Sequence, residues 1–388
     1  MREPIAVIGG GIGGLAAAIA LHQAGLPVRV FERADELREI GASLGVQSNA
    51  VRTLNRLGCG EDILAAGEPI DICEGFGLSS GRLLMRWRQD KVGERLGAPS
   101  VMVRRTDLQQ VLLNRLPPDV LTLSAEVSAV HGGDGDRPEI ELATGERVPV
   151  PVVVGADGVR SKVRGFVHPA AAVRPAGYRV WRSITPFQHE DYPARTMRQY
   201  LGRGRTFSMW HLRDGSVSWS ASLAGAPPLG RDGQLPLLRE LFRDAPPVVH
   251  ALLGDASEQE VIITDSVDLR PLPGWTRGRV TLLGDAAHAT TQVTGQGAAQ
   301  AIEDAVVLGR CLAGLTGEAS TEEITTRLLS YQEARLARTT KVIKEARLLG
   351  TVFHWRSTAG CWLRDTAFRL RPADSWTRQM ERRLSTVH

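Results

Sequence analysis

The chain has 388 residues, of which 43% are hydrophobic and 23% are charged, which excludes disordered and fibrous proteins and leaves room for about two lobes. Its 47 basic and 43 acidic residues give a net charge of only +4, so we expect no nucleic-acid interface, which would need a clustered basic face. The four cysteines lie far apart, without Cys-x-x-Cys or zinc-like spacing, so we expect no metal and no disulfide framework.

An apolar run opens the chain between Ile5 and Leu21. Such a run resembles a signal-peptide core or a short membrane span. Five glycines interrupt it, however, and no cleavage-site pattern follows. We therefore expect a buried strand, turn and helix, no stable membrane insertion and a cytoplasmic protein.

A glycine-rich turn follows the first predicted strand, residues 4–8, and leads into an apolar helix, residues 15–21. A second apolar strand, residues 28–31, completes a βαβ unit. In a Gly-x-Gly-x-x-Gly turn the first glycine permits the bend, the second lets the backbone approach a pyrophosphate, and the third lets the helix pack on the sheet. The helix dipole adds to the attraction for the pyrophosphate. Gly9, Gly11 and Gly14 take these three places in the sequence, and Gly10 and Gly13 also lie in the turn.

Glu32 ends the second strand, 18 residues after Gly14. A carboxylate at this place can accept hydrogen bonds from ribose hydroxyls and would repel a 2′-phosphate. The turn is therefore expected to bind FAD or NAD rather than NADP. A glycine run alone can be an ordinary loop, but the strand, the helix and the acid around this one favour dinucleotide binding.

Two later apolar segments also end in small and acidic residues. The first, residues 152–158, ends in Asp157-Gly158 before a basic helix start, and the second, residues 279–288, contains Gly284-Asp285. The loop at residues 295–297 then opens a long predicted helix. Free N–H groups at such a helix start suit the anionic end of a reduced flavin ring.

Together these segments resemble the three fingerprints of the group A FAD-dependent monooxygenases, the family of p-hydroxybenzoate hydroxylase and salicylate hydroxylase. The Asp-Gly fingerprint matches Asp157 and Gly158, and the Gly-Asp fingerprint matches Gly284 and Asp285. Residues 178–182, YRVWR, resemble the aromatic-rich start of the family's substrate sheet. The resemblance covers nearly the whole chain.

The resemblance implies an α/β fold of mixed α+β character, with a Rossmann-like FAD-binding domain, an interleaved substrate domain on an antiparallel or mixed β-sheet, and C-terminal helices. The FAD-binding domain would take residues 1–71, 102–177 and 268–320. The substrate domain would take residues 72–101 and 178–267. The C-terminal helical segment would be residues 321–388.

The resemblance also implies contacts at the adenosine end of FAD. Glu32 and Arg33 would hold the ribose, and the backbone of Val127 would touch the adenine. Arg105 would reach the FAD from its helix, although it could instead be a surface arginine.

Further contacts are implied toward the flavin ring. Asp157 would organise the pyrophosphate region and the path of the nicotinamide donor, and Asp285 would bind the ribityl hydroxyls. Each aspartate could instead only cap a turn or helix. We expect His288 to be a packed structural histidine rather than a base. The isoalloxazine would be faced by Gly295, Gln296 and Gly297.

The implied reaction uses NADH or NADPH and O2, and passes oxygen from a flavin C4a-hydroperoxide to a small aromatic or polycyclic substrate by hydroxylation or epoxidation. No second Gly-x-Gly-x-x-Gly follows residue 14, which argues against disulfide reductases and Baeyer-Villiger enzymes. Two alternatives stay open: another FAD-dependent oxidoreductase, such as a halogenase or reductase, and a non-catalytic flavin-binding regulatory protein. A halogenase would carry Trp-x-Trp-x-Ile-Pro, which is absent from the sequence.

Substrate residues are expected on strands that alternate in the manner of a half-exposed sheet, such as residues 207–211 and 217–220. Trp210, His211 and Trp219 are the substrate candidates, although each could equally lie on the outer face. His211 could deprotonate a phenol if it points inward. Arg182 could pair with a substrate carboxylate, or could be an ordinary surface arginine.

Gln292 stands four residues after His288, where family members usually carry proline, and its amide could bond substrate or flavin. Helical spacing continues from Thr321 to Leu349 and predicts a closing helix or a dimer seam, so the protein is expected to be a monomer or homodimer. The basic C-terminal stretch could be a solvated face or a contact for a membrane surface or partner. This stretch contains Arg364, Arg369, Arg371, Arg378, Arg382 and Arg383, with Trp362 and Trp376.

Overall fold

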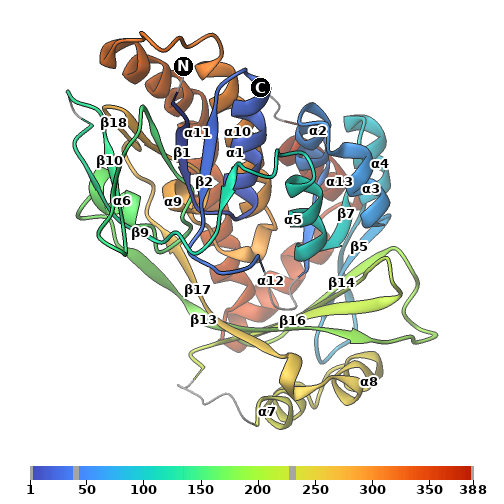
Figure 1. Ribbon diagram of the computed structural model, residues 1–388. Helices are drawn as coiled ribbons and strands as arrows, with labels where there is room; N and C mark the ends of the chain where they lie inside the picture. Colours follow the sequence, from blue (N-terminus) through green and yellow to red (C-terminus); the bar gives the residue numbers. More distant parts are fainter. Residues whose placement is uncertain (1–2, 38–42, 134, 227–232, 386–388) are drawn as a thin grey trace.

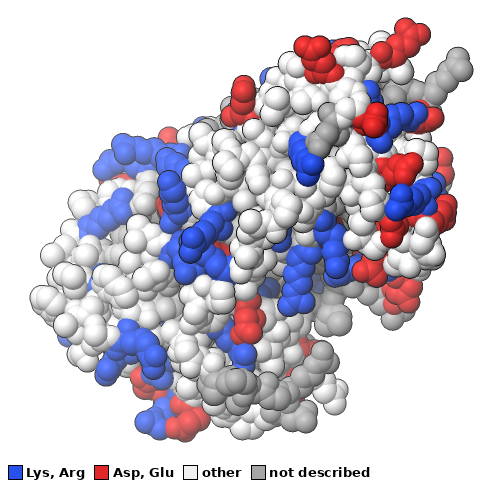
Figure 2. All heavy atoms as spheres, turned by 90° about the vertical axis from the view of Figure 1, so that its left-hand side faces the viewer, with Lys and Arg blue, Asp and Glu red and all other residues white. Residues whose placement is uncertain are grey.

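The computed structural model describes residues 3–37, 43–133, 135–226 and 233–385. Its fold is mixed α/β, with a parallel nucleotide-binding sheet above a larger mixed sheet in the view of Figure 1. None of the helices in these ranges is long and apolar enough to cross a lipid bilayer. On the face shown in Figure 2, Lys and Arg side chains are separated by uncharged surface and accompanied by Asp and Glu, so they form no continuous basic stripe.

The upper sheet has six strands, parallel except for β18 at one edge. Its central strands are fully buried apolar runs, as expected for a parallel sheet covered on both faces. In spatial order the strands are β18 (Thr276–Arg277), β19 (Val280–Leu282), β12 (Val153–Gly155), β1 (Ile5–Ile8), β2 (Val28–Phe31) and β8 (Leu121–Thr122).

Helices and two small sheets accompany this sheet. Helix α1 has apolar residues on nearly all sides and is almost entirely buried, since it packs between the sheet and α10. The helices of this part are α1 (Ile12–Gln23), α2 (Ser48–Arg56), α3 (Gly60–Ala66), α5 (Arg105–Leu113), α6 (Lys162–Val167), α9 (Asp285–His288), α10 (Gly297–Leu312) and α11 (Thr321–Phe353). Two three-stranded sheets accompany them: β9 (Val127–His131), β10 (Glu139–Leu142) and β11 (Arg147–Pro149), and β3 (Ser43–Val46), β7 (Val101–Arg104) and β4 (Glu68–Pro69).

The lower sheet has seven strands, antiparallel except for the parallel pair β14 and β5. One of its faces buries three large aromatic side chains, Trp181, Phe207 and Trp219, against helices α7 and α8, which lie beneath the sheet in Figure 1. In spatial order the strands are β17 (Ile262–Leu269), β13 (Val173–Pro186), β16 (Ser216–Ala224), β15 (Arg205–His211), β14 (Thr196–Leu201), β5 (Ile72–Gly77) and β6 (Leu83–Arg88).

The remaining helices are α4 (Gln89–Leu96), α7 (Gln234–Leu241), α8 (Pro247–Asp255), α12 (Thr358–Leu370) and α13 (Ala373–Leu384), with short 3-10 turns η1 (Glu258–Glu260) and η2 (Gln292–Thr294). The predicted C-terminal helix is therefore present as α11, and it is 33 residues long. Its buried positions face α10 and the edge of the upper sheet.

Candidate active site

The glycine-rich turn joins β1 to α1. Gly9 has a φ of +107°, a conformation that favours glycine. A β-carbon on Gly14 would lie 1.9 Å from the carbonyl oxygen of Gly9, so no side chain fits there. A β-carbon on Gly11 would meet no atom within 4 Å. Open space therefore lies against the first turn of α1, where backbone N–H groups have no intrahelical acceptor.

Glu32 closes this turn from β2. Its carboxylate accepts hydrogen bonds from the N–H of Gly10 at 2.6 Å and of Ala34 at 3.0 Å. Arg33 beside it is exposed, and Val127 is buried at the start of β9. Gln109, which the sequence did not single out, donates to the carbonyl of Gly10 at 3.1 Å from α5. The turn is therefore held from two sides.

Asp157 follows β12 and caps α6. Its Oδ2 accepts hydrogen bonds from the N–H groups of Lys162 at 2.6 Å and Val163 at 3.1 Å. Its Oδ1 is buried and has no hydrogen-bond partner among the described residues. Gly158 follows with a φ of +76°. Asp157 therefore caps the helix, which was one of the two roles considered for it above. Its Oδ1 remains available for another contact.

Arg164 joins the two downstream motifs, a role that was not predicted from the sequence. Its guanidinium is buried and donates to the carbonyl of Val159 at 2.6 Å and of Ala286 at 3.1 Å. Burial lowers its pKa, and Asp157 and Asp285 oppose that shift. Arg164 therefore links the Asp-Gly turn to the Gly-Asp turn.

Asp285 begins α9 at the end of β19. Surrounding protein raises the pKa of its carboxyl group, and His288, Arg105 and Arg164 oppose that rise. The residue is nevertheless exposed to solvent. A β-carbon on Gly297 would lie 3.9 Å from its Oδ1. A carboxylate that is surrounded by protein and still accessible must face an open space inside the molecule.

The loop at residues 295–297 lies beside this space. Gly295 is exposed with a φ of +62°. The side chain of Gln296 points away, because it is buried and donates to Gln47 Oε1 at 2.5 Å and accepts from Asn49 Nδ2 at 3.1 Å. This differs from the expectation that Gln296 faces the flavin with its neighbours, since only its backbone is left for such a contact.

A buried charge network holds this loop from behind. Arg335 of α11 donates to Asp304 Oδ1 at 2.6 Å and to Glu303 Oε2 at 2.7 Å. Asp304 Oδ2 also lies 2.5 Å from His288 Nε2 and accepts from the N–H of Gly284 at 3.0 Å. His288 is therefore a buried structural residue, as expected. Arg335, Glu303 and Asp304 were not predicted from the sequence, although two adjacent acids in an apolar helix are a usable signal.

Two arginines approach the same region from different parts of the fold. Burial lowers the pKa of Arg105, at the start of α5, and nearby Asp285 opposes this shift. Burial also lowers the pKa of Arg182, on β13, and the charge of Arg105 lowers it further. Arg182 donates to Thr264 Oγ1 at 2.6 Å, while its buried Nε has no hydrogen-bond partner within the described chain. The two cations are thus close enough to influence each other.

Arg182 lies on the face of the lower sheet that is turned toward the nucleotide-binding part. Trp210 on this face donates to Ser43 Oγ at 2.8 Å, and Ser43 donates to Ser218 Oγ at 2.7 Å. The cross-strand register places a polar row beside Arg182, formed by Ser220, Ser208 and Gln199. Trp210 is therefore on the expected side.

His211 and Trp219 lie on the opposite face, because side chains alternate along a strand. Trp219 is fully buried against α7 and α8 and donates to Thr185 Oγ1 at 3.0 Å. His211 stacks on Tyr192 with ring centroids 4.3 Å apart, and burial lowers its pKa. The expectation that these two residues contact substrate, with His211 as a base, is corrected: both point away from the side that carries Arg182.

Gln292 is exposed at the start of η2, and its Oε1 accepts a hydrogen bond from Ser266 Oγ at 3.1 Å. The amide therefore bonds to β17 of the lower sheet. Its position three residues before Gly295 keeps it close to the loop beside Asp285.

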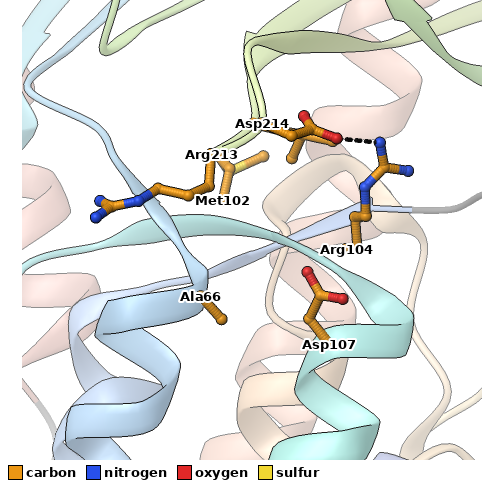
Figure 3. A pocket seen from close by; sticks show the side chains of 7 residues that line it. Ala66, Met102, Arg104, Asp107, Arg213 and Asp214 are labelled. Carbon is orange, nitrogen blue, oxygen red and sulfur yellow. Dashed lines mark hydrogen bonds and ion pairs between the residues drawn. The ribbon is translucent and has the colours of Figure 1, made fainter.

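A pocket of about 280 Å³ lies between the two parts of the molecule, where the turn after β15 meets α3 and α5 (Figure 3). Arg104 reaches across it to Asp214 Oδ2 at 2.5 Å. Burial raises the pKa of Asp214, but hydrogen bonds from Ser216 and Arg104 lower it more strongly, to about 2. This ion pair links the lower sheet to the helix that begins with Arg105.

The chain is similar to known proteins that bind FAD. Residues 2–175 and 255–346 match the family described as FAD binding domain. The chain is 32% identical to the aurachin C monooxygenase/isomerase of Stigmatella aurantiaca, over 95% of this chain and 94% of that protein. It is 32% identical to the 2-heptyl-3-hydroxy-4(1H)-quinolone synthase of Pseudomonas aeruginosa, over 98% and 97%. Among solved structures, Klebsiella pneumoniae HpxO with FAD and uric acid is similar, with a TM-score of 0.91, 26% identity and coverage of 98% and 96%.

Proposed function

Because this chain belongs to the FAD binding domain family and is an FAD-dependent monooxygenase with NAD(P)H as co-substrate, we propose that it hydroxylates a small fused heteroaromatic compound that carries hydroxy or oxo substituents. The proposal rests on one observation above all: Arg182 and a row of small polar side chains face the nucleotide-binding part of the molecule. Two similar proteins are described with compounds of this kind: one is a 2-heptyl-3-hydroxy-4(1H)-quinolone synthase, and the other is a complex with uric acid.

The residues around the open space fit an FAD molecule. The gap beside Gly11 and the free N–H groups of α1 suit a pyrophosphate. Glu32 would accept bonds from the adenosine ribose, and Asp285 from the ribityl hydroxyls. The backbone around Gly295 and Gly297 would lie against the flavin ring. Arg33, Arg105, Val127 and the Asp157-Gly158 turn keep their proposed supporting contacts.

When bound, the flavin supplies the redox chemistry, in which a hydride from NAD(P)H, a proton, one O2 and the substrate give the hydroxylated substrate, NAD(P)+ and water. The protein supplies binding, orientation and charge. Arg182, whose buried Nε lacks a partner among the described residues, would donate to an oxygen of the substrate. Ser220, Ser208 and Gln199 would bond the remaining polar edge of its rings.

Positive charge at Arg182 and Arg105 would also favour the ionised form of an acidic ring hydroxyl. Two nearby cations lower the pKa of such a group. The ionised ring is richer in electrons and therefore more reactive toward an electrophilic oxygen. This assignment requires no protein base at His211, which lies on the other face of the sheet.

The domain division is proposed on the same basis. Residues 1–71, 102–177 and 268–320 would form the FAD-binding domain, residues 72–101 and 178–267 the substrate domain, and residues 321–388 the closing helices. The lower sheet takes its strands from residues 72–88 and 173–269, which supports a substrate domain made of two separate stretches.

The test is a screen of hydroxy- and oxo-substituted fused heteroaromatics for stimulated NAD(P)H oxidation, O2 uptake and a product heavier by one oxygen atom. A substrate should accelerate NAD(P)H oxidation and give coupled product. Flavin reduction without any coupled product across this set would refute the proposed substrate class, and a protein whose flavin NAD(P)H does not reduce would favour the regulatory alternative.

A matched pair of variants locates the site. Arg182→Gln should raise the KM for the ring substrate by about 10- to 100-fold, because it removes a charge-assisted hydrogen bond. Arg179→Gln is the control, since Arg179 lies on the same strand and pairs with Asp265 at 2.8 Å. Equal effects of both substitutions on KM would contradict the assignment of Arg182.

A further inference from the structure

Helix α12 packs on the rest of the protein through one face only. Arg364 on that face is 2% exposed and donates to the carbonyls of Gly202 and Phe353, both at 3.1 Å. Cys361 is buried beside it, and Phe368 packs edge-on against Phe353 and Trp376. The helix is therefore firmly attached, with its orientation set by a buried arginine.

The outer face of α12 is apolar and uncovered. Trp362 is 68% exposed, Leu363 55% and Leu370 79%. They are three of the seven large hydrophobic side chains that are exposed in the described chain. With Ala359 they recur at intervals of three, one and seven residues, which places them along one side of a helix. Concentrated exposure of this kind marks an interaction surface.

Positive charge accompanies this face. From His354 to the end, the chain has seven arginines and three acidic residues; Arg364 is buried under α12 and Arg383 pairs with Glu345, and the other five arginines still outnumber the acids. Beside the start of α12 lies a pocket of about 550 Å³ lined by Arg203, Arg205 and Arg356 with a single acid, Asp244. Asp244 is bound by Arg205 at 2.6 Å, so the positive charge of the other two arginines is not balanced within the pocket.

We propose that α12 docks this protein on the surface of an anionic lipid bilayer. The apolar face would enter the boundary between headgroups and acyl chains, while the three-arginine pocket would take a lipid phosphate. A helix that lies in the interface needs an apolar side, flanking basic residues and no span-length apolar run, and α12 with its surroundings has these properties. Arginine is suited to phosphate because its guanidinium can donate two parallel hydrogen bonds.

An apolar cluster extends from beneath α12 toward the proposed flavin site. Its buried members are Leu84, Met85, Leu201, Phe353 and Trp376, and Val293 of η2 packs against it. Val293 lies two residues before Gly295. Bilayer docking would thus place the flavin-side loop one apolar layer away from the lipid surface. The docking itself does not depend on the proposed substrate.

The experiment uses the full-length, FAD-loaded protein and co-sedimentation with phosphatidylcholine vesicles, with or without phosphatidylglycerol. Wild type should pellet with the phosphatidylglycerol vesicles and be released by salt. The triple variant Trp362→Ser, Leu363→Ser, Leu370→Ser should bind at least about tenfold more weakly. Arg203→Gln with Arg356→Gln should weaken binding by roughly 25-fold, two basic contacts at the surface, and flatten the salt dependence.

Leu123→Ser with Leu329→Ser is the matched control, because both leucines are exposed outside α12 and should leave vesicle binding unchanged. FAD content and thermal melts verify that all variants are folded. Quenching by bromolipid that is present in wild type and lost in Trp362→Phe would place the indole in the bilayer.

Three results would overturn the proposal. Wild type could fail to pellet with anionic vesicles, or the triple variant could pellet as well as wild type. Sedimentation velocity could also show a dimer that the triple variant converts to monomers, in which case a second copy of the chain covers α12.

Discussion

Arg335 Nε lies 2.6 Å from Asp304 Oδ1, and both side chains are fully buried. The pair connects α11 to α10, and through Asp304 it reaches the N–H of Gly284 beside the proposed flavin site. A charge removed from water in this way is tolerated only while its partner remains.

Arg335→Met should therefore lower the free energy of unfolding by about 3–5 kcal/mol, since it removes the buried cation that lies between Asp304 and Glu303. Denaturant titration measures the change. Arg147→Ala removes an exposed arginine that pairs with Glu141 at 3.3 Å and should cost less than about 1 kcal/mol. Similar losses in both variants would mean that the buried network does not stabilise the fold.

Gly11→Ala should affect FAD binding without affecting stability, whereas Gly14→Ala should affect the stability of the fold. The methyl group at Gly11 enters open space, so the protein should melt as wild type does but should lose FAD affinity because the space is proposed for the pyrophosphate. The methyl group at Gly14 meets the backbone of Gly9, so this variant should be destabilised even without FAD. Thermal melts and flavin content measure both effects, and full flavin content in Gly11→Ala would speak against the assigned cradle.

Glu32→Ala should yield protein that has lost its FAD during purification. The carboxylate accepts two backbone N–H bonds, and its proposed hydrogen bonds to the ribose are charge-assisted. Their loss should lower the affinity for FAD by about 10- to 100-fold. Asp35→Ala, an exposed acid on the same segment, is the control and should keep its flavin. A fully loaded Glu32→Ala protein would remove the ribose assignment.

His354 should make stability depend on pH. Burial lowers its pKa to about 4, and its Nε2 lies 2.8 Å from Ser222 Oγ while its ring stacks on Tyr178. The unfolded histidine binds a proton near pH 6.5, so the unfolded state gains protons first as the pH falls.

The contribution of neutral His354 is therefore complete above pH 6.5 and is lost between pH 6.5 and 4, by up to about 3 kcal/mol. His354→Phe keeps an aromatic ring against Tyr178 and should lose that part of the pH dependence. Unfolding free energies at pH 7 and pH 5 for both proteins decide the matter. Parallel pH profiles would show that His354 is not the titrating group.

Much of the nucleotide-binding part was predictable from the sequence because its information is local. The turn from Gly9 to Gly14 follows from backbone conformation and close helix packing, and Glu32 follows from the length of a βαβ unit. The family resemblance added the Asp157 and Asp285 motifs, and the chain does belong to that family. The individual FAD contacts and the domain boundaries stay predictions.

The tertiary structure decided which side chains face which layer. Alternation along β15 and β16 places neighbours such as Trp210 and His211 on opposite faces, but the sequence does not state which face another layer covers. Only the packing of α7 and α8 buries Trp219 on the far side.

Ion pairs between residues far apart in the chain could not be predicted from the sequence either. Arg335 and Asp304, for example, lie 31 residues apart on separate helices. The partner of a charged side chain depends on how helices pack, and that is a property of the whole fold rather than of any one segment. The sequence by itself therefore determined the glycine-rich turn and its acid, whereas the folded chain determined which face of the lower sheet is turned toward the nucleotide-binding part, the buried charge network and the uncovered face of α12.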